Sequence, residues 1–153
     1  MSTQDNNPKD SVWVGLLPIN GDWSTLEKPH MTLVYGGVVS DYKPFDFNTL
    51  AKVVASVAML SRPFTLTVMG VDRMGPPEDL VSALILRPTP ELMAMRSFFD
   101  GWNKSEFPFR PHAAIGSYPA PTSVAPPPTQ VAFNKMMVCW GESDLTFNLN
   151  RSL

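Results

Sequence analysis

The chain has 153 residues, 44% of them hydrophobic, and a formal net charge of −2 from 12 basic and 14 acidic residues. This is enough apolar material for one ordinary domain with a buried core, and it excludes a disordered chain. The slightly acidic balance argues against binding to long nucleic acid duplexes, which depends on many Lys and Arg contacts, and favours a small anionic ligand. The single cysteine, Cys139, excludes an internal disulfide and a multi-cysteine zinc site and favours a reducing compartment.

The N-terminal segment is polar, so we expect a flexible stretch over residues 1–10 and a single domain over residues 11–153. Nothing at the start resembles a secretory signal, and no segment approaches the ~18 consecutive apolar residues of a membrane span. These features predict a soluble, cytoplasmic protein with no membrane partner.

The first half of the chain predicts mainly strands. Apolar and β-branched residues at 11–17, and again at 30–35 between a proline and two glycines, are typical of strands, and the second strand has His30 and Thr32 on one face. Apolar residues then recur at helical spacing, with Asp46 or Asn48 as the capping residue, until Pro63. Two further strands are expected at residues 64–69 and 80–86.

The second half begins with a strong helix signal. Thr89 can cap a helix from Pro90 to about Asp100, because proline suits the first helical position. A strand over residues 109–116 follows, and the five prolines of residues 118–128 predict a loop. The last expected strands are at residues 131–140 and 145–149, joined by a hairpin turn. Two helices among seven or eight strands predict an α+β domain.

The two histidines of the chain occur in the same local setting. Pro29-His30-Met31-Thr32-Leu33 and Pro111-His112-Ala113-Ala114-Ile115 each place a histidine after a proline and at the start of an apolar strand. The histidines are 82 residues apart, about half the chain, which suggests a duplicated lobe whose two strands meet across a cleft.

This pattern resembles the 2H phosphoesterase superfamily, whose signature is two copies of His-x-Thr/Ser on central strands. The resemblance covers the chain from about Ser11 to Leu149 and implies a bilobal, duplicated α+β fold, with two antiparallel sheets around a central cleft and helices outside. His30-Met31-Thr32 matches the signature fully, whereas Ala114 stands where the second hydroxyl residue belongs. The resemblance implies a phosphodiesterase with no cofactor.

Two imidazoles suit this chemistry because a pKa near 6.5 lets one neutral ring accept a proton while the other, protonated, donates one. We therefore expect His30 and His112 to act as an acid/base pair that needs no metal, although the sequence does not show which is the acid. Thr32, on the same strand face as His30, is expected to donate a hydrogen bond to a phosphate oxygen. Lys28 and Arg110, each two residues before a histidine, are expected to add positive charge to the substrate site.

Recognition of a nucleotide base requires aromatic faces and polar groups. Trp13, Trp140 and Tyr118 are candidates for stacking, although aromatic residues in strands usually belong to the core. Glu142 is a candidate for accepting hydrogen bonds from a base edge, although a charge in a hairpin turn is usually only solvated. Ser117 and Tyr118 are also candidates for replacing the hydroxyl that is missing at Ala114.

The substrate class is open at this stage. The small, proline-rich chain resembles bacteriophage anti-CBASS phosphodiesterases, which destroy the cyclic oligonucleotide signals of antiviral immunity, so a small cyclic nucleotide or short oligonucleotide is the expected partner. A 2',3'-cyclic phosphodiesterase acting on RNA ends is the alternative enzyme. A third possibility is a binding protein that holds the nucleotide without cleaving it, because one hydroxyl of the signature is missing.

Overall fold

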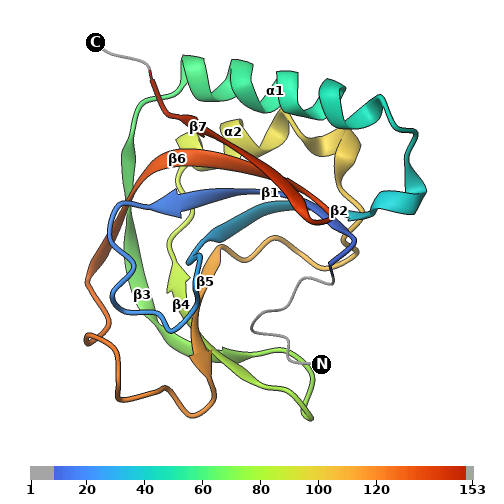
Figure 1. Cartoon of the computed structure of the whole chain (residues 1–153). Coiled ribbons are helices and arrows are strands. Elements are labelled where there is room, and N and C mark those ends of the chain that lie inside the picture. The colour runs from blue at the N-terminus through green and yellow to red at the C-terminus, as the bar shows by residue number, and fades with distance from the viewer. Residues whose placement is uncertain (1–8, 151–153) are drawn as a thin grey trace.

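The computed structural model describes residues 9–150, and the expected flexible segment falls outside the described residues for positions 1–8. Figure 1 shows strands and two longer helices in the order expected for an α+β chain. The strands are β1 (Ser11–Pro18), β2 (Met31–Val38), β3 (Phe64–Met74), β4 (Val81–Leu86), β5 (His112–Ser117), β6 (Gln130–Trp140) and β7 (Ser143–Asn148). The helices are α1 (Asp46–Leu60) and α2 (Pro90–Ser97), with short 3-10 turns at Val39–Asp41 and Asp100–Trp102.

The α+β fold is confirmed, and its strands are joined in one antiparallel sheet. The order is β1-β2-β5-β4-β3-β6-β7, and an additional pairing of β1 with β6 closes it on itself. β6 links the two halves because its first residues pair with β3 and its last residues pair with β1 and β7. The two sheets expected from the sequence are therefore hydrogen-bonded halves of one curved sheet.

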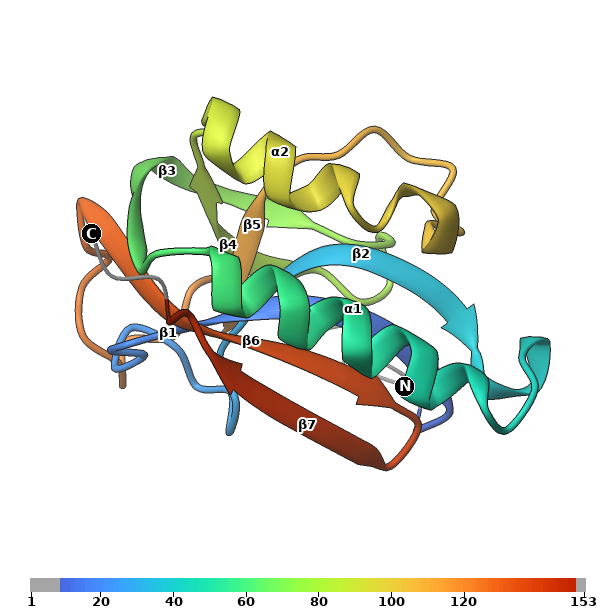
Figure 2. The same ribbon diagram turned by 90° about the horizontal axis from the view of Figure 1, so that it is seen from above.

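Both helices cover the same face of this sheet. α1 lies over β6 and β7, and α2 lies over the half that contains β3, β4 and β5 (Figure 2). The strands follow from period-two alternation. In β1, for example, Val12, Val14 and Leu16 join the core beneath the helices, while Trp13 and Gly15, at the alternate positions, face the other way. The face without helices is left free to carry polar side chains.

The capping predictions had different outcomes. Thr89 caps α2, since its side-chain oxygen accepts a hydrogen bond from the Leu92 amide at 3.1 Å. α1 is confirmed, but its N-cap is Phe45, and neither Asp46 nor Asn48 takes that position. The Asp46 carboxylate instead accepts a hydrogen bond from the Lys43 amide at 2.8 Å, closing the turn before the helix. It also lies in the first turn, where a negative charge is favoured by the helix dipole.

Candidate active site

The geometry of the site starts from one residue pair. β2 and β5 are antiparallel neighbours through Met31 and Ala113, and both side chains are buried in the core. The residues on either side of this pair therefore point to the opposite face. By continuation of the antiparallel register, His30 faces Ala114 and Thr32 faces His112. The two histidines occupy diagonal positions, which lie about 7–8 Å apart in an antiparallel pair.

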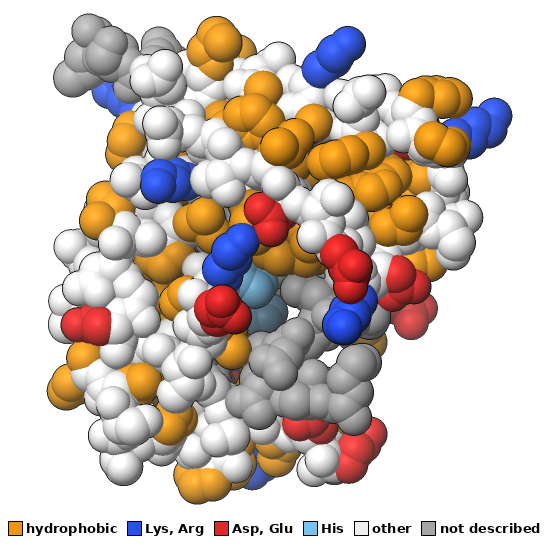
Figure 3. Space-filling model, in the orientation of Figure 1, with side chains coloured by type: hydrophobic (Ala, Val, Ile, Leu, Met, Phe, Trp, Pro, Cys, Tyr) orange, Lys and Arg blue, Asp and Glu red, His pale blue; other side chains and the backbone are white. Residues whose placement is uncertain are grey.

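These four positions line one cavity of about 820 Å³. Figure 3 shows histidine side chains at the bottom of a hollow near the middle of this face, beside basic and acidic side chains. The cavity walls combine polar and aromatic groups, among them Tyr35, Arg96, Phe107, Phe109 and Arg110. The fold thus brings His30 and Thr32 together with His112 and Ala114, which are about 80 residues away in the sequence, as the duplicated motif predicts.

Each histidine ring is held by the backbone immediately before it. His30 Nδ1 lies 2.9 Å from the Lys28 carbonyl oxygen, and His112 Nδ1 lies 2.7 Å from the Arg110 carbonyl oxygen. A carbonyl oxygen can only accept a hydrogen bond, so each Nδ1 carries the proton and donates it. In a neutral ring the other nitrogen, Nε2, is then unprotonated. Both imidazoles therefore have Nε2 as the nitrogen that exchanges protons with a ligand.

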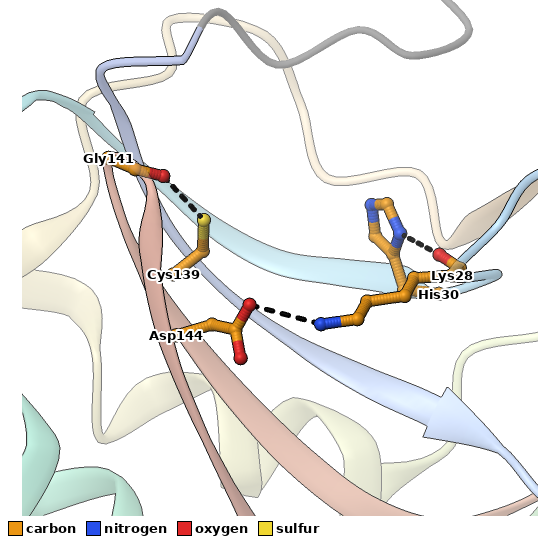
Figure 4. Close-up of polar contacts among 5 residues, drawn as sticks. All are labelled: Lys28, His30, Cys139, Gly141 and Asp144. Atoms are coloured by element: carbon orange, nitrogen blue, oxygen red, sulfur yellow. Dashed lines mark hydrogen bonds and ion pairs between the residues drawn. The ribbon is translucent and has the colours of Figure 1, made fainter.

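The residues that supply these carbonyls form ion pairs through their side chains. Lys28 Nζ lies 3.0 Å from a carboxylate oxygen of Asp144 on β7 (Figure 4), and Arg110 donates to Asp72 on β3 at 2.9 Å. The hydrogen bond from Arg110 lowers the pKa of Asp72 and keeps it ionised. The two histidines thus have matching supports, in which a cation two residues upstream is paired with an aspartate of another strand.

His30 has a second support that His112 does not share among the described contacts. Its ring stacks on Trp13 with centroids 4.3 Å apart and an interplanar angle of 22°. Burial lowers the pKa of His30 below its usual 6.5, the hydrogen bond to the Lys28 carbonyl opposes this change, and the charge of a protonated His112 lowers it further. Burial therefore favours the neutral form of His30, which is the form a general base requires.

The sequence matches the 2'-5' RNA ligase superfamily over residues 19–137. The chain belongs to this family, the LigT-like 2H phosphoesterases. Members of the 2H superfamily are phosphodiesterases, and this chain is an enzyme of that type.

Solved structures share the fold of this 2H phosphoesterase at low sequence identity. Escherichia coli LigT complexed with 3'-AMP has a TM-score of 0.54 and 14% identity, with 94% of this chain and 96% of LigT covered. Kluyveromyces marxianus Usb1 has a TM-score of 0.61 and 10% identity, with coverage of 92% and 98%. The protein TT0787 of Thermus thermophilus has a TM-score of 0.58 and 12% identity, with coverage of 94% and 100%. LigT has also been solved with NADP+ and with ATP. No curated protein is similar enough in sequence to match the chain.

The four cleft positions of this 2H phosphoesterase are chemically unequal. Thr32 is half-buried in the cavity wall, where its hydroxyl can donate to a phosphate oxygen beside His112. Ala114 also lines the cavity but provides only a methyl group, opposite His30. Tyr118, considered as a source of the missing hydroxyl, does not line the cavity, and its ring lies beneath the Arg73 guanidinium. At these positions the cavity therefore has one threonine hydroxyl, where the family signature has two hydroxyl residues.

The residues expected to recognise a base lie mostly outside the cavity. Trp13 is only 4% exposed and stacks on His30, so its ring supports the histidine. Trp140 lies in the core, with its ring 5.0 Å from that of Tyr42. Glu142 is an exposed turn residue whose carboxylate oxygen Oε1 lies 4.0 Å from Lys9 Nζ. Among the charged candidates, Arg110 lines the cavity and Lys28 does not.

Cys139 lies next to this region without the properties of a nucleophile. It pairs with Trp13 in the β1–β6 register and is half-buried. Burial raises the pKa of its thiol, which therefore stays protonated, and Sγ lies 3.5 Å from the Gly141 carbonyl oxygen (Figure 4).

Several residues of the site were missed by reasoning from the sequence. Gly15 is one, since an added Cβ would lie 2.8 Å from the Trp13 ring, so its lack of a side chain leaves room for the indole beneath His30. Arg96 is another, and the sequence holds a signal for it. It follows Leu92 by four residues and lies beside Met95, on the buried stripe of α2, where a charge is out of place unless it has a function. The cavity residue Phe107 lies in a segment without periodicity and gave no signal. Phe109 was included in the strand expected over residues 109–116, but β5 begins only at His112.

Two absences concern the described part of the chain. Residues 9–150 contain no group of three or more His, Cys, Asp or Glu side chains placed to hold a metal ion. Neither α1 nor α2 has the length and apolar character needed to cross a lipid bilayer.

Proposed function

We propose that this phosphodiesterase hydrolyses a small cyclic oligonucleotide without a metal ion, with His30 as the general base and His112 as the general acid. The observation that carries the proposal is the pair of histidines in one cavity, each with Nδ1 bound to a backbone carbonyl and Nε2 left for proton exchange. Two such rings on either side of one phosphate can take a proton from the attacking oxygen and deliver one to the leaving oxygen.

The assignment of roles rests on the burial of His30. Burial favours the neutral form of His30, which suits it to accept a proton. His112 is the remaining ring, and its Nε2 would donate the proton. Thr32, which faces His112, would hold a non-bridging phosphate oxygen and stabilise the charge that develops there.

The reaction balances as a displacement at phosphorus. His30 Nε2 removes a proton from water or from a ribose 2'-hydroxyl, and that oxygen forms a bond to phosphorus. The bond from phosphorus to the leaving oxygen breaks, and the proton of His112 Nε2 moves to that oxygen. His30 ends protonated and His112 neutral, and proton exchange with solvent restores both rings.

The dimensions and charge of the protein support a small substrate. A cavity of about 820 Å³ lies within the range of about 300–1,000 Å³ that is usual for small-molecule sites. A net charge of −2 gives little general attraction to a long phosphate backbone. With the resemblance to bacteriophage anti-CBASS enzymes, these features favour the destruction of cyclic oligonucleotide signals in the cytoplasm of a host cell.

A second candidate is hydrolysis of 2',3'-cyclic phosphate ends of RNA. The observation that favours it is the structural similarity to LigT complexed with 3'-AMP, a nucleotide whose phosphate is on the ribose 3' oxygen. A mononucleotide end would also fit the cavity, so the two candidates differ in the substrate and share the acid/base pair.

The test is a product screen in the presence of EDTA. The protein is incubated with cyclic di- and trinucleotides, 2',3'-cyclic mononucleotides and short RNAs with 2',3'-cyclic ends, and the products are separated by chromatography and identified by mass spectrometry. Attack by water adds the mass of one water, whereas attack by a ribose 2'-hydroxyl gives a linear product of unchanged mass with a 2',3'-cyclic phosphate end. Turnover of cyclic oligonucleotides at rates well above the others supports the lead proposal, whereas faster turnover of RNA ends supports the second candidate.

Two results would contradict the proposal. Loss of all activity on chelation, restored by zinc or manganese, would show that a metal is required. Tight binding of a cyclic nucleotide without any turnover would identify a nucleotide-binding protein in which the alanine at position 114 has ended catalysis.

A further inference from the structure

Arg96 reaches the active-site cavity from the helix layer. Its Nε donates to the Leu33 carbonyl oxygen of β2 at 2.9 Å, and its guanidinium carbon lies 4.3 Å from the centre of the Phe109 ring. These two contacts hold the guanidinium in one orientation while it is half-buried in the cavity wall. A planar fork fixed in this way is suited to a phosphate, because its remaining N–H groups can donate two parallel hydrogen bonds.

The charge of Arg96 is uncompensated. Of the two Lys or Arg side chains that line the cavity, Arg110 is paired with Asp72, whereas Arg96 makes no ion pair with any carboxylate among residues 9–150. A cation that is partly removed from water without a counter-charge is unfavourable unless a ligand supplies one. The cavity thus has a positive site that is separate from its histidine pair.

The anchor of Arg96 lies further along β2 than His30. Leu33 is three residues after His30 along extended backbone, which rises about 3.3 Å per residue, so the backbone carbonyl that holds the guanidinium is roughly 10 Å along β2 from His30. A substrate whose scissile phosphate lies at His30 can therefore extend along the cavity and bring its next phosphate to Arg96.

The cavity also offers a surface for the nucleoside between two such phosphates. Phe107 lines it with a side chain that is 76% exposed, which leaves a ring face free for stacking. Phe109 differs because its ring is covered by Arg96. The polar side chains of Asn103 and Ser105 lie in the same cavity wall.

We propose that Arg96 binds a second, non-scissile phosphate of the substrate and so selects a ligand with at least two phosphates over a mononucleotide. The proposal rests on the proposed function, because it names the second phosphate relative to the one held by His30 and His112. That phosphate is a diester in a cyclic dinucleotide and a monoester in a terminally phosphorylated one.

The test measures binding and needs no turnover. Calorimetric titration of the catalytically silenced His112→Ala protein compares the dinucleoside monophosphate ApA with pApA, ApAp and cyclic di-AMP. With Arg96 present, an added phosphate should tighten binding by about tenfold or more over ApA, as a charge-assisted bidentate contact would. Dependence of pApA or ApAp binding on Arg96 assigns a monoester to the site, and dependence of cyclic di-AMP binding assigns a diester.

Variants of Arg96 test whether the tighter binding of the phosphorylated ligands depends on this arginine. In an Arg96→Gln background the phosphorylated ligands should bind no better than ApA, while Arg96→Lys should retain part of the gain because it keeps the charge without the fork. Arg87→Gln is the matched control, since Arg87 is an exposed arginine outside the cavity lining and its loss should leave the gain unchanged.

The proposal is overturned if the added phosphate tightens binding equally with and without Arg96. It is also overturned if the added phosphate does not tighten binding to the protein that has Arg96. A purely structural role, as a tether between α2 and β2, would weaken binding of all ligands alike and lower the melting temperature, without changing the difference between them. Failure of the proposed function is seen separately, as the lack of any turnover by wild-type protein in the product screen.

Discussion

The half of the active site that carries His30 and the half that carries His112 share a scaffold and differ in chemistry. In both, Nδ1 donates to the carbonyl two residues upstream, and the side chain at that upstream position pairs with an aspartate. Among residues 9–150, only the His30 half has a stacked indole, and within the signature only that half has a threonine. The comparison teaches that the backbone geometry fixing the imidazoles is repeated between the halves, whereas the aromatic support and the hydroxyl residue are not.

Removal of either imidazole is expected to have the largest effect. His30→Ala and His112→Ala should each lower turnover by at least about 100-fold, because general acid and base catalysis contributes 10²–10⁴-fold. The variants are assayed on the best substrate of the product screen, with circular dichroism as the control for folding. Near-wild-type turnover by either variant would show that the two halves do not act as an acid/base pair.

The hydroxyl at position 32 and its absence at position 114 predict different effects on turnover for substitutions at the two positions. Thr32→Ala should reduce turnover by about tenfold or more, since it removes a hydrogen bond to developing negative charge. Ala114→Thr should be tolerated or mildly activating, because it restores the second hydroxyl of the signature. Measurement of kcat and KM for both variants tests this, and an unchanged kcat in Thr32→Ala would remove the threonine from the phosphate site.

The stack on His30 predicts a shift in the pH profile. A base must be neutral, so the acid limb of kcat/KM should lie below pH 6.5 in the wild-type enzyme. Trp13→Leu admits water to the ring, which should raise the pKa of His30 toward 6.5 and move this limb to higher pH. Trp140→Leu is the matched control because it removes a buried indole elsewhere and should leave the limb in place.

The same pKa shift has a consequence for stability. The unfolded chain binds a proton at this imidazole near pH 6.5, whereas the folded protein binds it only at lower pH. The folded state therefore loses stability as the pH falls below 6.5, and Trp13→Leu should weaken this dependence. Denaturant unfolding at several pH values measures it, and identical pH dependence in both proteins would contradict the effect of burial.

The ion pairs behind the two histidines are expected to have the smallest effect. Asp144→Asn and Asp72→Asn should each leave turnover within about twofold of wild type, because exposed pairs contribute little. The backbone carbonyls of Lys28 and Arg110 remain in both variants. A large loss of kcat in only one of them would show that the supports, and not only the reactive groups, differ between the halves.

Much of the fold was predictable from local patterns. Runs of apolar and β-branched residues predicted β1 and β6 closely, and the sequence Thr89-Pro90-Glu91 predicted the start of α2. Boundaries were less accurate where turns decide them. β3 runs to Met74 because it pairs with β4 as far as Val81, a non-local hydrogen-bonding partner that alternation within residues 64–69 does not reveal.

The sequence by itself determined the two candidate catalytic histidines, because a duplicated Pro-His motif half a chain apart is visible without any coordinates. The tertiary structure decided which other side chains share their cavity. Arg96 comes from α2 and Phe107 from an irregular segment, and they meet β2 and β5 only because the helices pack over a sheet whose order departs from the chain order. The tertiary structure also decided that Trp13 stacks on His30 and that Trp140 belongs to the core. Strand alternation defines two faces of the sheet, and the packing of the helices decides which face is the cleft.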